Sequence, residues 1–275
     1  MKILISGASG LLGRAIVDRF KNDENGRGHQ VISLSFTRSG PGLEKIDLRD
    51  EQSVSNLIHD LKPDVFIHCA AERRPDVAER DPTGTEKLNV RVTEHLAELS
   101  NQFGFKMIYI CTDYVFDGNA PMGGYDVDAT PNPTNFYGKT KLAGEQAMLN
   151  TVVNLLEVFR YGKAETNNES DYVLTANVNC VEFQDPLPPI LHCSSEKEYT
   201  KYKISLEFAK LLKLSEAETK NLIPQPEPPK LAQGETMRPR DCRLSNRALS
   251  SLGISVQHAD FIDWWSAYLH TNQSG

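Results

Sequence analysis

The fold is decided near the N-terminus by Lys2-Ile3-Leu4-Ile5-Ser6-Gly7-Ala8-Ser9-Gly10-Leu11-Leu12-Gly13. The mostly apolar residues before Gly7 predict a short buried strand, and the apolar spacing after Gly10 predicts an amphipathic helix. A glycine-rich turn between them leaves backbone N–H groups uncovered at a helix N-terminus, where a diphosphate can bind. The stretch therefore predicts a dinucleotide-binding strand–turn–helix unit. The alternative is a tight junction that holds no ligand.

A second motif follows at Tyr137-Gly138-Lys139-Thr140-Lys141. A tyrosine and a lysine four residues apart lie one above the other on a helix face. An ammonium group in that position can lower the pKa of the phenol. This pair, placed after a glycine turn of this kind, is typical of nicotinamide-binding folds of the short-chain dehydrogenase type.

The first 160 residues alternate strand-like and helical patterns, which predicts an α/β fold with a doubly wound parallel sheet. A long helix is expected from about Thr85 to Phe103, and strands are expected at residues 2–6, 31–36, 45–48, 64–69, 106–111 and near 152–159. After Gly162 the pattern loosens. We therefore divide the chain into a Rossmann domain, residues 1–162, and a smaller C-terminal region, residues 163–275, with a last strand near 190–193.

Composition excludes several classes of function. The 275 residues carry a net charge of −7 without a basic tract, which argues against a nucleic acid or an anionic membrane as partner. No apolar run approaches the roughly 20 residues of a membrane span, and no signal peptide is expected. The five cysteines form no Cys-x-x-Cys pair, so we expect reduced thiols and no metal site. We therefore expect a cytoplasmic protein, and a nuclear location is the alternative.

The end of the second predicted strand indicates which dinucleotide would bind. NAD-binding folds place an acidic residue there to bind the ribose 2′-hydroxyl, but residues 31–38 contain no acid and end at Arg38. A guanidinium can bind a 2′-phosphate through paired hydrogen bonds, so NADP(H) is favoured over NAD(H). The alternative is that Arg38 is a solvated loop residue. Small residues at Cys69-Ala70-Ala71, after the fourth strand, would let a cofactor pass close to the backbone.

Three stretches resemble the dTDP-4-dehydrorhamnose reductase group of the extended short-chain dehydrogenase/reductase superfamily. They are the glycine turn from Gly7 to Gly13, residues 112–118 (Thr-Asp-Tyr-Val-Phe-Asp-Gly) and residues 135–145 around Tyr137. A narrower likeness, over residues 68–77, is to the regulatory beta subunits of methionine adenosyltransferase, which belong to the same group. That run includes Arg73-Arg74-Pro75-Asp76, which reads equally as an anion contact or as an ordinary helix start.

The resemblance implies a role for each matching position. It places Gly7, Ser9, Gly10, Leu11, Leu12 and Gly13 at the pyrophosphate, Phe36, Thr37 and Arg38 at the ribose phosphate, and Asp47 and Leu48 at the adenine. Cys69, Ala70, Ala71, Arg73, Tyr137 and Lys141 would line the rest of the cofactor path. In reductases of the superfamily Thr112, Tyr137 and Lys141 form the catalytic set: Thr112 orients the substrate oxygen, Tyr137 donates a proton, and Lys141 holds the nicotinamide ribose. In a regulatory subunit Tyr137 and Lys141 would only bind the cofactor.

The segment between Gly162 and Ile190 is shorter than in the reductases that the chain resembles, so the substrate side is expected to be incomplete. The favoured function is an NADP-binding, non-catalytic regulatory subunit, whose partner is the catalytic subunit of methionine adenosyltransferase. The alternative is an NADPH-dependent reductase of a nucleotide-activated keto sugar. A third possibility is a folded relic that binds cofactor weakly and has no partner.

Overall fold

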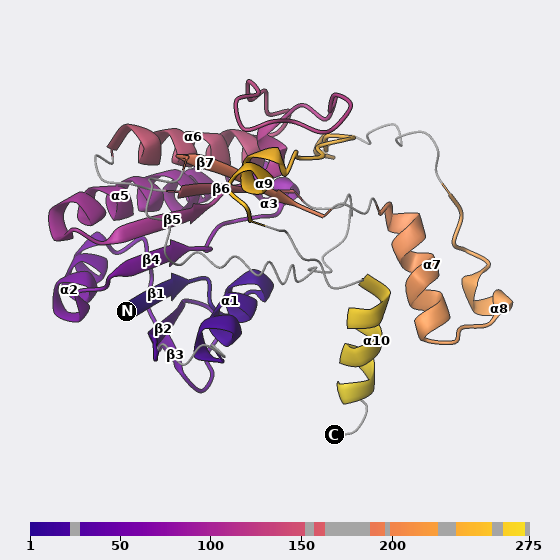
Figure 1. Cartoon of the computed structure of the whole chain (residues 1–275), viewed down its shortest axis with the longest axis horizontal. Helices are drawn as coiled ribbons and strands as arrows, with labels where there is room; N and C mark the ends of the chain where they lie inside the picture. The colour runs from indigo at the N-terminus through magenta and orange to yellow at the C-terminus, as the bar shows by residue number, and fades with distance from the viewer. Residues whose placement is uncertain are drawn as a thin grey trace.

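The computed structural model describes residues 1–22, 28–151, 157–162, 188–195, 199–224, 235–254 and 261–272. Within these residues the molecule is built on one parallel sheet of seven strands in the order β3-β2-β1-β4-β5-β6-β7 (Figure 1). The strands are β1 (Lys2–Ser6), β2 (Gln30–Ser35), β3 (Leu43–Lys45), β4 (Val65–His68), β5 (Lys106–Ile110), β6 (Glu157–Gly162) and β7 (Ile190–Ser194). The predicted α/β fold with a parallel sheet is confirmed.

Helices cover both faces of the sheet (Figure 1). Those packed around the larger apolar cluster are α2 (Glu51–Leu61), α5 (Val92–Phe103) and α6 (Phe136–Thr151). The other face carries α1 (Leu11–Lys21) beside β1 and α9 (Arg247–Ser251) beside β7. The shorter elements are α3 (Pro75–Arg80), α4 (Pro82–Glu86), the π-helical turn η1 (Lys87–Arg91) and the 3₁₀ turn η2 (Asp113–Val115).

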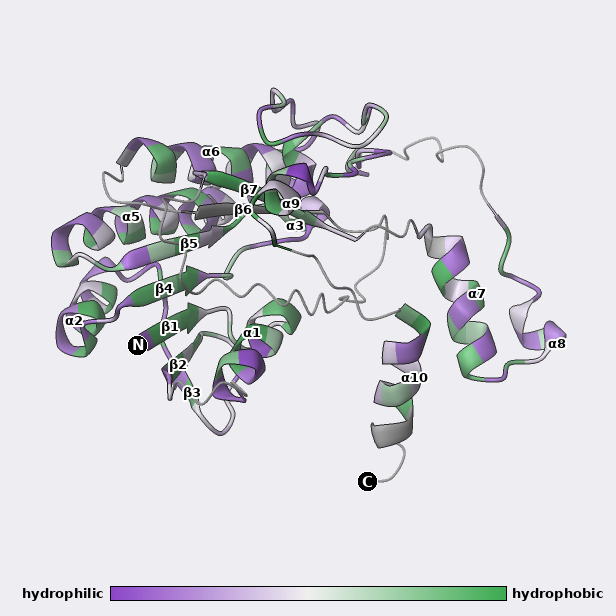
Figure 2. Ribbon diagram, in the orientation of Figure 1, coloured by the Kyte–Doolittle hydropathy of each residue, from purple (hydrophilic) through white to green (hydrophobic). Residues whose placement is uncertain are grey.

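The strands are apolar toward both faces, as a parallel sheet covered on both sides requires. Leu4 and Phe66 pack with the α2, α5 and α6 side, whereas their neighbours Ile3, Ile5 and Ile67 pack with the α1 side. Figure 2 shows this as hydrophobic strands at the centre of the sheet. The chain runs outward from β1 to β3 and then returns to β4 on the other side of β1. The switch point of the sheet therefore lies between β1 and β4, where open α/β sheets bind their ligands.

Several boundaries differ from those predicted. The third strand is β3, so Asp47 and Leu48 follow it instead of ending it; the last backbone bond to β2 is from Ile46 N to Ser35 O. The long helix expected from Thr85 is a continuous run of α4, η1 and α5, with one π-helical turn inside it. The start of the predicted sixth strand, residues 152–156, and the shortened segment 163–187 lie outside the described residues.

The C-terminal region contributes β7 to the edge of the sheet beside β6. Residues 235–245 run back across the body, forming parallel bridges from Asn119 to Asp241 and from Tyr125 to Leu244. Three helices lie farther from the sheet (Figure 1): α7 (Lys201–Leu211), α8 (Glu216–Thr219) and α10 (Phe261–Asn272). No helix in the described parts of the chain combines the length and the apolar character needed to cross a bilayer.

Candidate cofactor site

The glycine turn lies at the switch point and packs on the backbone that follows β4. Gly7 adopts a left-handed conformation with φ +66°, and a Cβ there would lie 2.9 Å from the amide nitrogen of Ala70. Helix α1 then begins after Gly10, which supplies no side-chain cap, and its first turn holds no acidic residue. The N–H groups and the positive end of the helix dipole are therefore left for an anion.

A buried hydrogen-bonded link holds the ends of β1 and β4 together beneath this turn. The Ser6 hydroxyl lies 2.7 Å from Nδ1 of His68, and its oxygen accepts from the backbone N–H of Ala70 at 3.3 Å. Burial, with a smaller contribution from the Lys141 charge, lowers the pKa of His68 to about 3. His68 is therefore neutral at physiological pH, and the link positions the backbone of Cys69 and Ala70 against Gly7.

Arg38 lies over the glycine turn, and its contact with a ribose phosphate stays a prediction. Its Nη1 donates to the carbonyl oxygen of Ser9 at 2.7 Å. The Ser35 hydroxyl lies 3.0 Å from the Ser9 hydroxyl and 2.8 Å from the Arg38 carbonyl, which ties the end of β2 to the turn. In the described part of the chain no carboxylate pairs with Arg38, and its exposed guanidinium, like the neighbouring Thr37, faces solvent. The residues present fit a phosphorylated ribose.

The part of the site predicted for the adenine holds a residue that the sequence analysis missed. Arg49 donates from Nε and Nη2 to the two carboxylate oxygens of Asp47, each at 2.8 Å, and its guanidinium lies 5.0 Å from the centre of the Phe36 ring. This hydrogen-bonded pairing lowers the pKa of Asp47. Leu48 is buried and Phe36 is 45% exposed. An Asp-x-Arg spacing immediately before a helix was the available signal for this pair.

Thr112 and Tyr137 lie at the end of the site predicted for the nicotinamide. The Thr112 hydroxyl caps η2, where it accepts from the Tyr114 N–H and donates to Oδ1 of Asp113 at 3.1 Å. Burial raises the pKa of Tyr137 above its ordinary value, and the nearby Thr112 only partly offsets this. The expectation that Lys141 lowers the pKa of this phenol was therefore wrong.

Lys141 points instead at Tyr109, with its Nζ 4.0 Å from the ring centre. Gly144 allows this packing, because a Cβ there would lie 2.6 Å from the Tyr109 hydroxyl. The lysine is only 2% exposed. Burial lowers its pKa to about 8, although the Cys111 and Cys69 thiols favour the charged form. The same burial raises the pKa of Cys69 to about 12, so this thiol is protonated.

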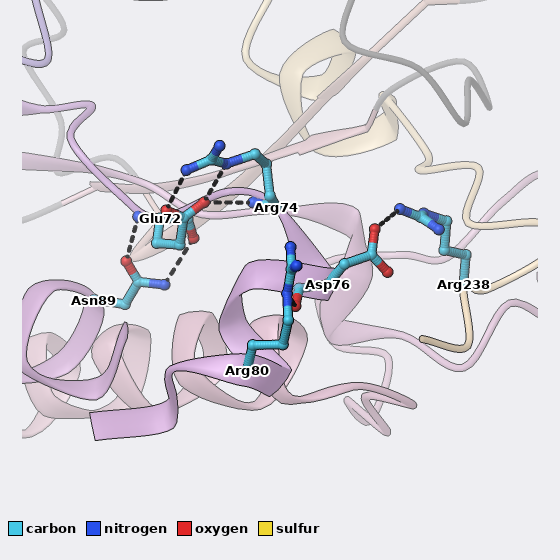
Figure 3. A network of polar contacts seen from close by, with 6 residues as sticks. All are labelled: Glu72, Arg74, Asp76, Arg80, Asn89 and Arg238. Atoms are coloured by element: carbon cyan, nitrogen blue, oxygen red, sulfur yellow. Dashed lines mark hydrogen bonds and ion pairs between the residues drawn. The ribbon is translucent and has the colours of Figure 1, made fainter. Parts of the chain in front are cut away.

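The residues after Ala71 form the network in Figure 3, which favours the helix-start interpretation of Pro75 and Asp76. Pro75 is the first residue of α3, and Asp76 lies in its first turn. Asp76 pairs with Arg238 at 2.7 Å, a contact across 162 positions that no local pattern could predict. Arg74 pairs with Glu72 at 3.0 Å. Arg73 is exposed, and its cofactor role stays a prediction.

The fold thus gathers most predicted positions at one edge of the sheet. The glycine turn, the ends of β2 and β4 and the residues after β3 surround the switch point, while Thr112, Tyr137 and Lys141 lie at the ends of β5 and α6. No group of His, Cys, Asp and Glu among the described residues could hold a metal ion. This arrangement can hold a dinucleotide in an extended form across the switch point.

Comparisons with known proteins agree with this geometry. The RmlD substrate binding domain family matches residues 1–176. Methionine adenosyltransferase 2 subunit beta of Xenopus laevis is 35% identical over 288 residues, covering 92% of this chain and 83% of that protein. The dTDP-4-dehydrorhamnose reductase of Mycolicibacterium smegmatis is 34% identical over 179 residues, covering 63% of this chain and 49% of that protein. The crystal structure of dTDP-4-dehydrorhamnose reductase from Bacillus anthracis in complex with NADP shares the fold, with a TM-score of 0.72, 20% identity and 98% of each chain covered.

Proposed function

The chain belongs to the RmlD substrate binding domain family, and we propose that it is an NADP-binding regulatory subunit of a methionine adenosyltransferase. The observation that carries the proposal is its 35% identity to a beta subunit of that enzyme over 92% of the chain. The partner would be the catalytic subunit, and the role would be in S-adenosylmethionine synthesis in the cytoplasm. Residues 1–162 would hold the cofactor, and residues 163–275 would complete the sheet and face the partner.

The cofactor proposal rests on the fit of the residues at the switch point. The N–H groups of the glycine turn and of α1 would bind the pyrophosphate, and Arg38 would bind the ribose 2′-phosphate through charge-assisted hydrogen bonds. An acidic side chain that would repel this phosphate is lacking from residues 31–38, which supports NADP(H) over NAD(H). Cys69 and Ala70 would lie along the cofactor, and Lys141 would bind the nicotinamide ribose.

A bound NADPH supplies a hydride, and the chain's own residues decide whether that chemistry can proceed. The proximity of Thr112 to Tyr137 keeps open the alternative of a nucleotide-sugar reductase, with Tyr137 donating the proton. The raised pKa of Tyr137 makes the phenol a weaker proton donor, which counts against this alternative. We place this alternative second, because the identity to the reductase of M. smegmatis covers only 63% of the chain.

Two measurements separate these proposals. Calorimetry with the purified catalytic subunit, with NADPH present, is expected to show a stable complex; no heat at micromolar concentrations would refute the regulatory function. NADPH oxidation with dTDP-4-dehydrorhamnose is expected to stay at background. Turnover that disappears in Tyr137→Phe would establish the reductase instead. A thermal shift larger with NADPH than with NADH tests the cofactor preference, because a ligand of the folded state raises its stability.

A further inference from the structure

Phe36 and Arg49 lie against each other at the edge of the sheet where the proposed cofactor would place its adenine. Phe36 follows β2 directly and is 45% exposed. The Arg49 guanidinium covers the ring at 5.0 Å from its centre. Stacked guanidinium and aromatic planes are the kind of surface on which a purine base stacks.

Asp47 holds Arg49 in this position. Its carboxylate accepts three hydrogen bonds from the arginine: from the backbone N–H at 3.0 Å, and from Nε and Nη2 at 2.8 Å each. The rigid planar fork of arginine makes such a two-point contact fix the orientation of the whole group, which a lysine could not do. The guanidinium is therefore oriented before any ligand arrives, and little side-chain entropy would be lost on binding.

The same contacts change the role expected for Asp47. Both of its carboxylate oxygens are engaged by Arg49, so this carboxylate is poorly placed to select the adenine amino group. The pairing with Asp47 also neutralises much of the charge of Arg49. Arg38 has no carboxylate partner among the described residues, so it is the better ligand for the 2′-phosphate. The arrangement favours Arg49 as a stacking surface over Arg49 as a phosphate ligand.

We propose that Arg49 is an adenine-binding residue, that it acts with Phe36 as a stacking platform, and that Asp47 is its positioning residue. This inference rests on the proposed dinucleotide binding and deepens it. Because NADPH and NADH share the adenine, the platform contributes equally to both. Arg38 instead contributes to NADPH alone, so the two arginines have separable effects.

The test is calorimetric titration of the full chain with NADPH and with NADH. Phe36→Leu, Arg49→Leu and Arg49→Lys are each expected to weaken both ligands by the same factor, about tenfold, the size of one lost stacking contact. Arg49→Lys is the informative variant, since it keeps the charge and loses the plane. Arg38→Leu should weaken NADPH alone. The matched control is Arg247→Lys, an exposed arginine of α9 that pairs with Asp126 and lies beside β7 at the opposite edge of the sheet.

The remaining outcomes overturn the inference in distinguishable ways. Loss of NADPH binding alone in Arg49→Leu, restored in Arg49→Lys, would make Arg49 a phosphate ligand. Unchanged affinities in all Phe36 and Arg49 variants would remove the platform while the dinucleotide site stands. If the wild-type chain binds neither dinucleotide, the proposed function fails first and this inference fails with it. Equal melting temperatures without ligand show that the variants are folded.

Discussion

Replacing Lys141 with methionine should stabilise the protein at neutral pH in the absence of ligand. The side chain is 2% exposed, and burial lowers its pKa from 10.5 to about 8. Each pKa unit corresponds to about 1.4 kcal/mol. Holding the ammonium charged inside the fold therefore costs on the order of 3 kcal/mol at pH 7. Methionine keeps the unbranched shape of the chain and carries no charge.

The pH dependence has a definite sign. Between pH 8 and 10.5 the unfolded chain keeps the lysine proton and the folded chain has lost it, so the stability contributed by this group rises with pH. The advantage of Lys141→Met over the wild type should therefore shrink across this window and vanish near pH 10.5. Other groups titrate there too, including Cys193, whose pKa burial raises to about 11. They are common to both proteins and cancel in the difference.

The assay is urea unfolding of both proteins from pH 7 to 10.5, followed by circular dichroism. Lys139→Met, an exposed lysine on the same helix, is the control and should show no pH-dependent difference. A constant difference between Lys141→Met and the wild type would refute the reasoning. So would a variant that is less stable at pH 7, because the contacts of the ammonium would then outweigh its desolvation.

Two further predictions concern the backbone of the site and its link to the C-terminal region. Gly7→Ala should lower the free energy of unfolding by well over about 1 kcal/mol and abolish NADPH binding, because the alanine would need a left-handed φ and would contact the backbone of Ala70. Gly104 is also left-handed but lies in open space, so Gly104→Ala should lower the free energy of unfolding by only about 1 kcal/mol. Denaturant unfolding compares the two variants. Asp76→Asn with Arg238→Gln in a double-mutant cycle should give a coupling of about 0.5–1 kcal/mol, because both side chains are partly exposed; a coupling of zero would show that the pair does not stabilise the fold.

The sequence predicted the fold well where the pattern is local. The apolar run before Gly7 and the glycine turn itself specify β1 and the start of α1 to the residue. The third strand was misplaced, because the apolar Ile46 and Leu48 look like strand residues and only Leu43–Lys45 pairs with β2. The spacing of apolar residues indicates which positions are buried, and it does not separate a strand from a loop here, because both β3 and the residues that follow it are partly buried.

Contacts between distant residues could not be predicted. The pairing of Asp76 with Arg238 and the approach of Lys141 to Tyr109 depend on where the fold brings separate elements together. The expected effect of Lys141 on Tyr137 failed for a different reason: the four-residue spacing is correct, but burial dominates the pKa of the phenol. Nor could a local pattern show that Phe261 and Trp265 of α10 pack on Phe208 of α7.

The cost of Lys141 also bears on whether the site is a relic. A penalty on the order of 3 kcal/mol is a large share of the 5–15 kcal/mol that stabilises a typical domain. Perturbed, costly groups of this kind are concentrated at functional sites. If Lys141 binds the nicotinamide ribose, saturating NADPH should reverse the order of stability: the wild type gains about 4.1 kcal/mol at a thousandfold excess over Kd, and Lys141→Met gains much less. If Lys141→Met stays more stable than the wild type by the same margin with NADPH present, then Lys141 destabilises the fold without binding the cofactor. That result is expected of a relic.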